Sequence, residues 1–227
     1  MFTVRSDKPA LREGINGAWL LATVSTQSVS ILSSLLASHW PDQQAELLFF
    51  SACMFFIGGM LYIIIITLIF YRFMFFPMKP RELKSPYWIN MGAEAITTLA
   101  GLTLVADSGH FQFIESLKWP ILMFVLFFWS TATFWIPELL LLGFWRYVIH
   151  RIRFSYTPQH WGMVFPLGMY TTCTAKLSQI TGLDFIRYIP EYFIYIALTA
   201  WFTTMAVYIR AQSKSLMSAV LTSSHSE

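Results

Sequence analysis

The sequence has little charge. Only 12% of its 227 residues are Asp, Glu, Lys or Arg, whereas 56% are hydrophobic and 18% are aromatic. An ordinary soluble domain carries about 25% charged residues, so this chain has too few charges to cover a water-exposed surface. The composition excludes an ordinary soluble protein and indicates a protein that lies in a lipid bilayer.

Residue types that build catalytic and metal centres are also scarce. The two cysteines, Cys53 and Cys173, fall within apolar stretches, where a thiol is usually a small apolar filler. The five histidines fall in predicted loops, termini or helix ends, which leaves no haem ligand in the middle of a membrane. No Ser-His-Asp, HExxH or phosphate-loop pattern is present. We therefore predict that the protein is not an enzyme and has neither cofactor nor metal.

Long apolar stretches make up most of the chain. A helix needs ~20 residues to cross a bilayer, and six stretches reach that length. We expect an all-α membrane protein in which residues 15–212 form one transmembrane domain between a polar segment, 1–14, and a polar tail, 213–227. The six predicted helices lie near 15–37, 45–75, 87–106, 119–149, 161–182 and 189–209.

The helices repeat in pairs. Trp19, Trp88 and Trp161 are separated by 69 and 73 residues, and each begins a helix rich in small residues that a second, aromatic helix follows. Such a period indicates a repeated unit, here three helical hairpins at about 15–76, 87–150 and 161–210. In eighteen-residue windows the odd helices hold five aromatic residues in all and the even helices seventeen. Because small residues allow close helix approach, we expect the odd helices inside and the even helices outside.

Lys and Arg gather on one side of the predicted helices. Twelve of the fifteen lie before the first helix, between the second and third, between the fourth and fifth, or after the sixth. Cytoplasmic loops retain positive charge, so we expect both termini in the cytoplasm and the protein in the cell membrane. The exceptions are Lys118, Arg187 and, within the fifth helix, Lys176. Without a nucleic-acid-binding motif in these short segments, no nucleic acid partner is predicted.

The first predicted helix carries a polar stripe. Its members recur at helical spacing and share one face: Thr23, Gln27, Ser30 and Ser34. Such a stripe either bonds to neighbouring helices or lines a conduit. One stripe alone favours the first explanation, whereas three small-residue helices at a fixed period favour a conduit.

The fifth predicted helix carries a second candidate site. Phe165, Gly168, Thr172 and Lys176 share one face. The neighbouring Pro166 cannot donate a backbone hydrogen bond, so we expect it to kink the helix. A ring beside a kink, followed by a small residue, a hydroxyl and a cation, suits a gated anion path. The alternatives are ordinary helix packing for Phe165 and snorkelling to the headgroups for Lys176.

Three longer motifs add a family resemblance: WxxxFPLGMY at 161–170, WINMGA leading to ITTLAG at 88–101, and WIP leading to GFWR at 135–146. In these the chain resembles the tellurite-resistance/C4-dicarboxylate transporter family, which includes bacterial tellurite-resistance proteins, yeast malic acid and sulfite transporters and the plant guard-cell slow anion channel. The resemblance implies a homotrimer whose subunits each have five hairpins, with five inner helices around an anion path. It also implies that Phe165, in its matching Phe-Pro context, plugs that path.

We therefore expect transport of small anions, such as malate or another C4-dicarboxylate, sulfite, tellurite or an inorganic anion, through the bilayer. The gate would consist of Phe165, Pro166 and Gly168. The residues expected to line the path are Thr23, Gln27, Ser30, Ser34, Glu94, Thr97, Thr98, Gly101, Thr172 and Lys176.

The chain departs from the family pattern in two ways. Its three hairpins match the last three of five, so the alternative to a transporter is a truncated, non-conducting remnant or a structural subunit that needs other chains. In addition, Glu94 and Glu138 fall where uncharged residues are expected. A carboxylate on an anion path would repel its cargo, so we expect Glu94 to be either protonated or paired with Lys176.

Overall fold

The computed structural model describes residues 6–106, 111–153 and 156–223, and these residues form helices and turns without a strand. The predicted all-α fold is confirmed. Short helices α1 (Leu11–Gly14) and α5 (Gln112–Ser116) accompany six long ones. The long helices are α2 (Leu21–Ala37), α3 (Gln44–Phe75), α4 (Ile89–Ala106), α6 (Lys118–Phe144), α7 (Trp161–Thr181) and α8 (Tyr188–Ser223).

Among the described residues five spans are long and apolar enough to cross a membrane, and they contain α2, α3, α4, α6 and α8. Their bounds are Gly17–Ala37, Pro41–Phe75, Ser85–Ala106, Lys118–Ile149 and Asp184–Ser213. With 21 residues α7 is also long enough, but its hydroxyls and Lys176 make it less apolar. Five of the six predicted spans are thus supported by length and composition, and the fifth predicted helix, α7, stays a prediction as a span.

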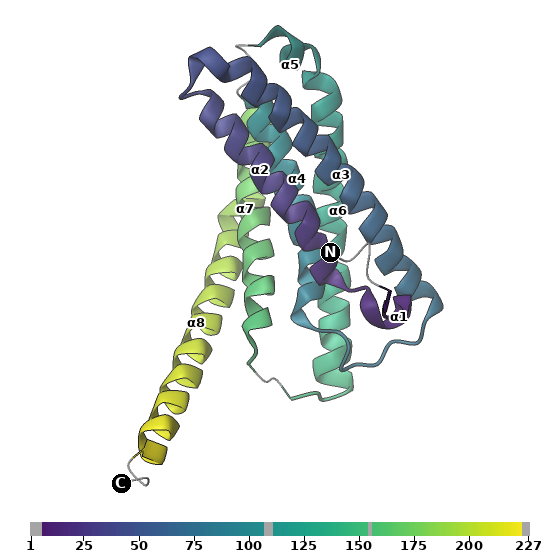
Figure 1. The fold of residues 1–227 in the computed structure, drawn as a ribbon, viewed down its shortest axis with the longest axis vertical. Coiled ribbons are helices and arrows are strands. Elements are labelled where there is room, and N and C mark those ends of the chain that lie inside the picture. The colour runs from purple at the N-terminus through teal and green to yellow at the C-terminus, as the bar shows by residue number, and fades with distance from the viewer. Residues whose placement is uncertain (1–5, 107–110, 154–155, 224–227) are drawn as a thin grey trace.

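The helix α4 lies at the centre of the bundle, in contact with α2, α3, α6 and α7 (Figure 1). In the apolar window of its span 89% of the residues are buried, against 28% for α6 and 6% for α8. The second pair, α4 and α6, follows the predicted order of an inner and an outer helix. The first pair does not, because α2 and α3 are each 39% buried. The reason is that α2 lies at the edge of the bundle, with Leu21, Leu32 and Leu35 exposed.

Each of the three repeated tryptophans lies where a short 3₁₀ turn meets a long helix. The turns are η1 (Gly17–Leu20), η3 (Ser85–Trp88) and η6 (Pro158–His160). In the first turn the Asn16 side chain accepts a hydrogen bond from the Ala18 amide at 2.9 Å, which satisfies one of the free donors at a helix start. In the other two turns a proline at the beginning supplies the required φ without needing a donor.

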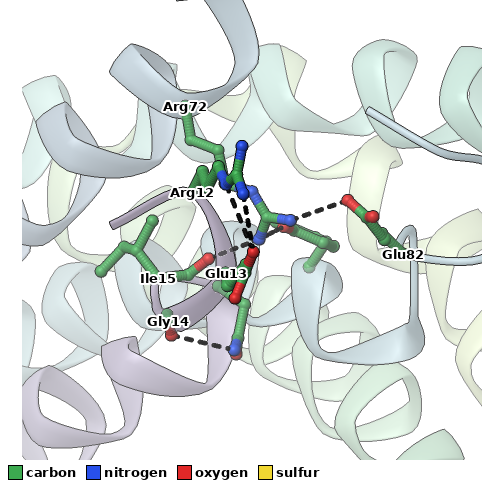
Figure 2. Close-up of polar contacts among 8 residues, drawn as sticks. Arg12, Glu13, Gly14, Ile15, Arg72 and Glu82 are labelled. Carbon is green, nitrogen blue, oxygen red and sulfur yellow. Dashed lines mark hydrogen bonds and ion pairs between the residues drawn. The ribbon is translucent and has the colours of Figure 1, made fainter. Parts of the chain in front are cut away.

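The turns η1, η3 and η6 lie in contact at one end of the bundle, and the segments beside them carry most of the basic residues of the described chain. At this basic end Arg72, at the end of α3, is 7% exposed. Its Nη1 donates to the Ile15 carbonyl oxygen at 2.6 Å and to the Tyr87 hydroxyl at 2.9 Å, and its Nη2 contacts Glu82 Oε2 at 3.0 Å (Figure 2). One buried side chain therefore joins the N-terminal segment, α3, the following loop and η3. We call Arg72 and these partners the arginine clasp.

The first two repeats approach closely beside the clasp. A Cβ on Gly17 would overlap the backbone of Pro86 and Tyr87. Only glycine permits this contact between η1 and η3. The contact fixes how far α2 is shifted along its axis relative to α4, which lies beside it. The same relation holds between the second and third repeats, because a Cβ on Gly92 of α4 would meet the Pro166 ring of α7 at 2.7 Å.

Candidate functional site

The polar stripe of α2 faces α3. Gln27 Nε2 donates to the Phe55 carbonyl oxygen at 3.0 Å, and Ser30 Oγ donates to the Ser51 carbonyl oxygen at 2.9 Å. The Ser34 and Ser51 hydroxyls lie 2.8 Å apart. All four members of the stripe, Thr23 included, are fully buried. In this chain three of them therefore form a hydrogen-bonded joint between two helices, as in the first of the two explanations considered for the stripe.

The predicted lining residues of α4 are buried among α3 and α6. Glu94 is 1% exposed, and its carboxyl group interacts with the hydroxyls of Tyr62 and Thr131. Tyr62 in turn accepts a hydrogen bond from Trp135 Nε1 at 3.2 Å. A Cβ on Gly101 would meet Val125 of α6 at 2.5 Å. This face of α4 is therefore packed against the outer helices.

On the same face of α4, one threonine hydroxyl bonds within its own helix and another has no partner among the described residues. Thr97 Oγ1 donates to the Ala93 carbonyl oxygen of its own helix at 2.7 Å. Within the described part of the chain, Thr98 Oγ1 and Glu94 Oε2 lack a hydrogen-bond partner. The expected pair between Glu94 and Lys176 is absent from the described ion pairs, and Lys176 is only half-buried, on α7. The second acidic residue, Glu138, is half-buried on α6.

The α7 residues lie on an open face. Phe165 is 38% exposed and Thr172 is exposed, whereas Gly168 and Lys176 are half-buried. A Cβ on Gly168 would meet nothing within 4 Å. Pro166, one position after Phe165, is buried against Gly92 of α4. The helix is therefore anchored on its proline side and free on its phenylalanine side.

The predicted site residues thus form two groups. Those of α2 and α4 are buried in helix joints, and those of α7 lie on one open face except Pro166, which is buried against α4. The structure does not bring the two groups onto one surface, so the lining role of the α2 and α4 residues remains a prediction without support from their contacts. The described residues contain no group of three or more His, Cys, Asp or Glu that could hold a metal ion.

Asn90 and Ser51 are two of the buried polar residues that were not among the predicted site residues. Asn90 is fully buried, and both of its side-chain polar atoms lack a partner within the described residues. Ser51 Oγ donates to the Ser30 carbonyl oxygen at 2.8 Å and lies 2.8 Å from the Ser34 hydroxyl. The spacing Asn90, Glu94 and Thr98, four residues apart, marks one face of a helix and could have identified Asn90. No comparable spacing marks Ser51, because the positions three and four residues away on α3 are apolar.

Comparison with known proteins bears on what these helices do. A sequence profile of the family described as voltage-dependent anion channel matches residues 1–209. An uncharacterized membrane protein of Mycobacterium tuberculosis is 34% identical over 146 residues, which cover 63% of this chain and 73% of that protein. An uncharacterized transporter of Methanocaldococcus jannaschii is 24% identical over 195 residues, or 84% of this chain and 54% of that protein.

A second uncharacterized transporter of Methanocaldococcus jannaschii, 25% identical, is covered to the same extent. The chain thus spans about half the length of these archaeal relatives. No solved structure matches significantly. Because the profile match covers all three repeats, the resemblance inferred from the tryptophan-led motifs is confirmed, and the chain belongs to the voltage-dependent anion channel family.

Proposed function

We propose that this protein moves small anions across the cell membrane along the open face of α7, with Phe165 as the gate. Membership of an anion channel family supports transport, and relatives are named transporters. The single observation that carries the gate is the exposed Phe165 ring beside Gly168, where a Cβ would find open space. Malate and other C4-dicarboxylates, sulfite, tellurite and inorganic anions are the proposed cargo.

The same face supplies a physical reason for anion selectivity. Thr172 follows Phe165 by seven residues and Lys176 by eleven, so a hydroxyl donor and a cation continue the stripe beyond the ring. Donors and positive charge lower the energy of an anion within a pore. Pro166, held against Gly92, would keep the helix in place while the Phe165 ring swings toward Gly168.

Further helices would complete the path. Among the described residues Phe165 and Thr172 remain exposed on this face of α7, and we propose that other subunits cover it in a homotrimer. A second candidate function is that of a structural subunit that does not conduct by itself. The observation that favours it is the burial of Gln27, Ser30 and Glu94 in helix joints, because side chains used in packing cannot also line an aqueous path.

Orientation is the first property to test. We propose that both termini are cytoplasmic, because the arginine clasp and the Tyr156–Tyr208 ring contact place the N-terminal segment and the distal part of α8 at the same basic end. In intact cells a cysteine replacing the exposed Ser38 should react with an impermeant thiol reagent, and one replacing the exposed Ser213 should react only after permeabilisation. The reverse pattern would exclude this orientation. Ser108, in the next outward loop, lies outside the described residues.

The gate is tested by Phe165→Ala. Removing the ring should raise anion efflux from liposomes by about tenfold, which corresponds to lowering a barrier by ~1.4 kcal/mol. The yield of folded protein should stay unchanged, because a ring that is 38% exposed loses less packing than a buried one. Phe202→Ala is the matched control, since that ring is 62% exposed on α8.

Efflux is compared at equal amounts of reconstituted protein. A gate predicts that only Phe165→Ala increases it, while a lipid-facing role predicts equal behaviour of the two variants. If neither the native chain nor Phe165→Ala conducts, the structural-subunit function is favoured over transport by this chain alone.

A further inference from the structure

A cavity of about 380 Å³ lies at the basic end, apart from the open face of α7. It is formed by η3, the end of α6 with its π-helical turn η5 (Trp145–Ile149), and the beginning of α7. Its polar lining includes Lys84, Arg146 and His160, and none of its lining residues is acidic. The cavity is therefore electropositive.

Arg146 supplies the central donor of this cavity. Its Nε is buried and has no hydrogen-bond partner within the described residues, and its guanidinium carbon lies 5.1 Å from the centre of the Tyr147 ring. No described ion pair involves Arg146 or Lys84. Buried donors of a guanidinium are normally satisfied, and planar guanidinium groups bind phosphate well. An unpaired guanidinium donor in a basic cavity is suited to bind an anion.

The other wall of the cavity is apolar and opens outward. Leu140 is 60% exposed, Phe144 55% and Val148 56%, and all three line the cavity. Gly143 lies between them, and a Cβ there would meet nothing within 4 Å. This cavity thus combines basic residues on one side with an apolar side that faces the lipid.

The position of the cavity along the helices matches the lipid headgroup region. The candidate membrane span of α6 ends at Ile149, and that of α4 begins at Ser85, so Arg146 and Lys84 lie at the ends of their spans. Basic pockets between helices at this level bind anionic lipid headgroups. A soluble anion would contact only the basic residues, so the apolar wall would have no role in binding it.

We propose that this cavity binds an anionic phospholipid, with the phosphate on Arg146 and Lys84 and an acyl chain along Leu140 and Phe144. The site adds a lipid-binding function that is independent of anion transport. Its contacts would tie η3 at the beginning of α4 to the end of α6 and the beginning of α7, where the loop between α6 and α7 leaves the bundle.

Native mass spectrometry of the detergent-purified full chain tests this proposal. At equal lipid concentrations phosphatidylglycerol should be retained well above phosphatidylcholine. Arg146→Gln should reduce its retention by about fivefold, the effect of one basic residue near an anionic surface. Arg153→Gln is the matched control, because Arg153 is exposed on the adjacent loop and does not line the cavity. Equal retention of the two lipids, or equal loss in both variants, would overturn the proposal.

Two further variants separate the effect of charge on lipid retention from the effect of cavity volume and from misfolding. Arg146→Lys keeps the charge and should restore part of the retention, whereas Gly143→Phe keeps every charge but fills the cavity and should abolish it. A titration with inorganic phosphate identifies the source of the anion. Protection of the protein against heat by inorganic phosphate, without retention of phosphatidylglycerol, would contradict a lipid site.

Discussion

Replacing Arg72 with methionine should destabilise the protein by about 3 kcal/mol, the lower end of the range for breaking a buried ion pair. The Arg72 side chain is 8% exposed and serves three partners from three segments. Its loss would leave the Ile15 carbonyl and the Tyr87 hydroxyl without their donor. The lower end applies because the Glu82 side chain is 39% exposed and water can solvate it again.

Thermal unfolding of the purified protein measures this effect. Arg12→Met is the matched control, because the Arg12–Glu13 pair is 64% and 66% exposed and exposed pairs contribute at most ~1 kcal/mol. Arg72→Lys should lie between the two, since a single ammonium keeps the charge but lacks the planar fork that reaches several partners. Equal unfolding temperatures for Arg72→Met and Arg12→Met would show that the clasp does not hold the basic end together.

Glu94→Lys should have an even larger effect and abolish most of the folded protein. The side chain is 1% exposed in the centre of the bundle, and a buried unpaired ion costs several kcal/mol in proteins. The neutral, nearly isosteric Glu94→Gln keeps an oxygen for the hydroxyls of Tyr62 and Thr131 and should remain folded.

The fraction of monodisperse protein in size-exclusion chromatography distinguishes these outcomes. Glu46→Lys controls for charge reversal, because Glu46 is exposed in the first turn of α3. Normal yield of Glu94→Lys would mean that water reaches this residue. That result would support the predicted position of Glu94 on an aqueous path over its position in a helix joint.

Local pattern was sufficient for the positions of most helices, although α8 continues to Ser223, well past the predicted end at 209. The predicted stretch 45–75 became α3, Gln44–Phe75, and 87–106 became η3 and α4. Hydropathy averaged over ~20 residues identifies a membrane helix directly, because each backbone polar group in lipid must be satisfied within its own helix. The three tryptophans likewise marked the 3₁₀ turns η1, η3 and η6, and the same motifs identified the family.

Only the tertiary structure decided which neighbour each helix face meets. Periodicity placed Gln27, Ser30 and Ser34 on one face of α2. It could not distinguish a joint with α3 from the wall of a path, because both arrangements shield these polar groups from lipid. In α3, Arg72 resembles any charged residue at a helix end, and its role depends on Ile15, 57 residues away. The amino-acid sequence by itself determined helices, charge asymmetry and family, because these depend on residues close in the chain. The rotation of each helix, and with it the burial of Glu94 and the exposure of Phe165, depends on long-range packing.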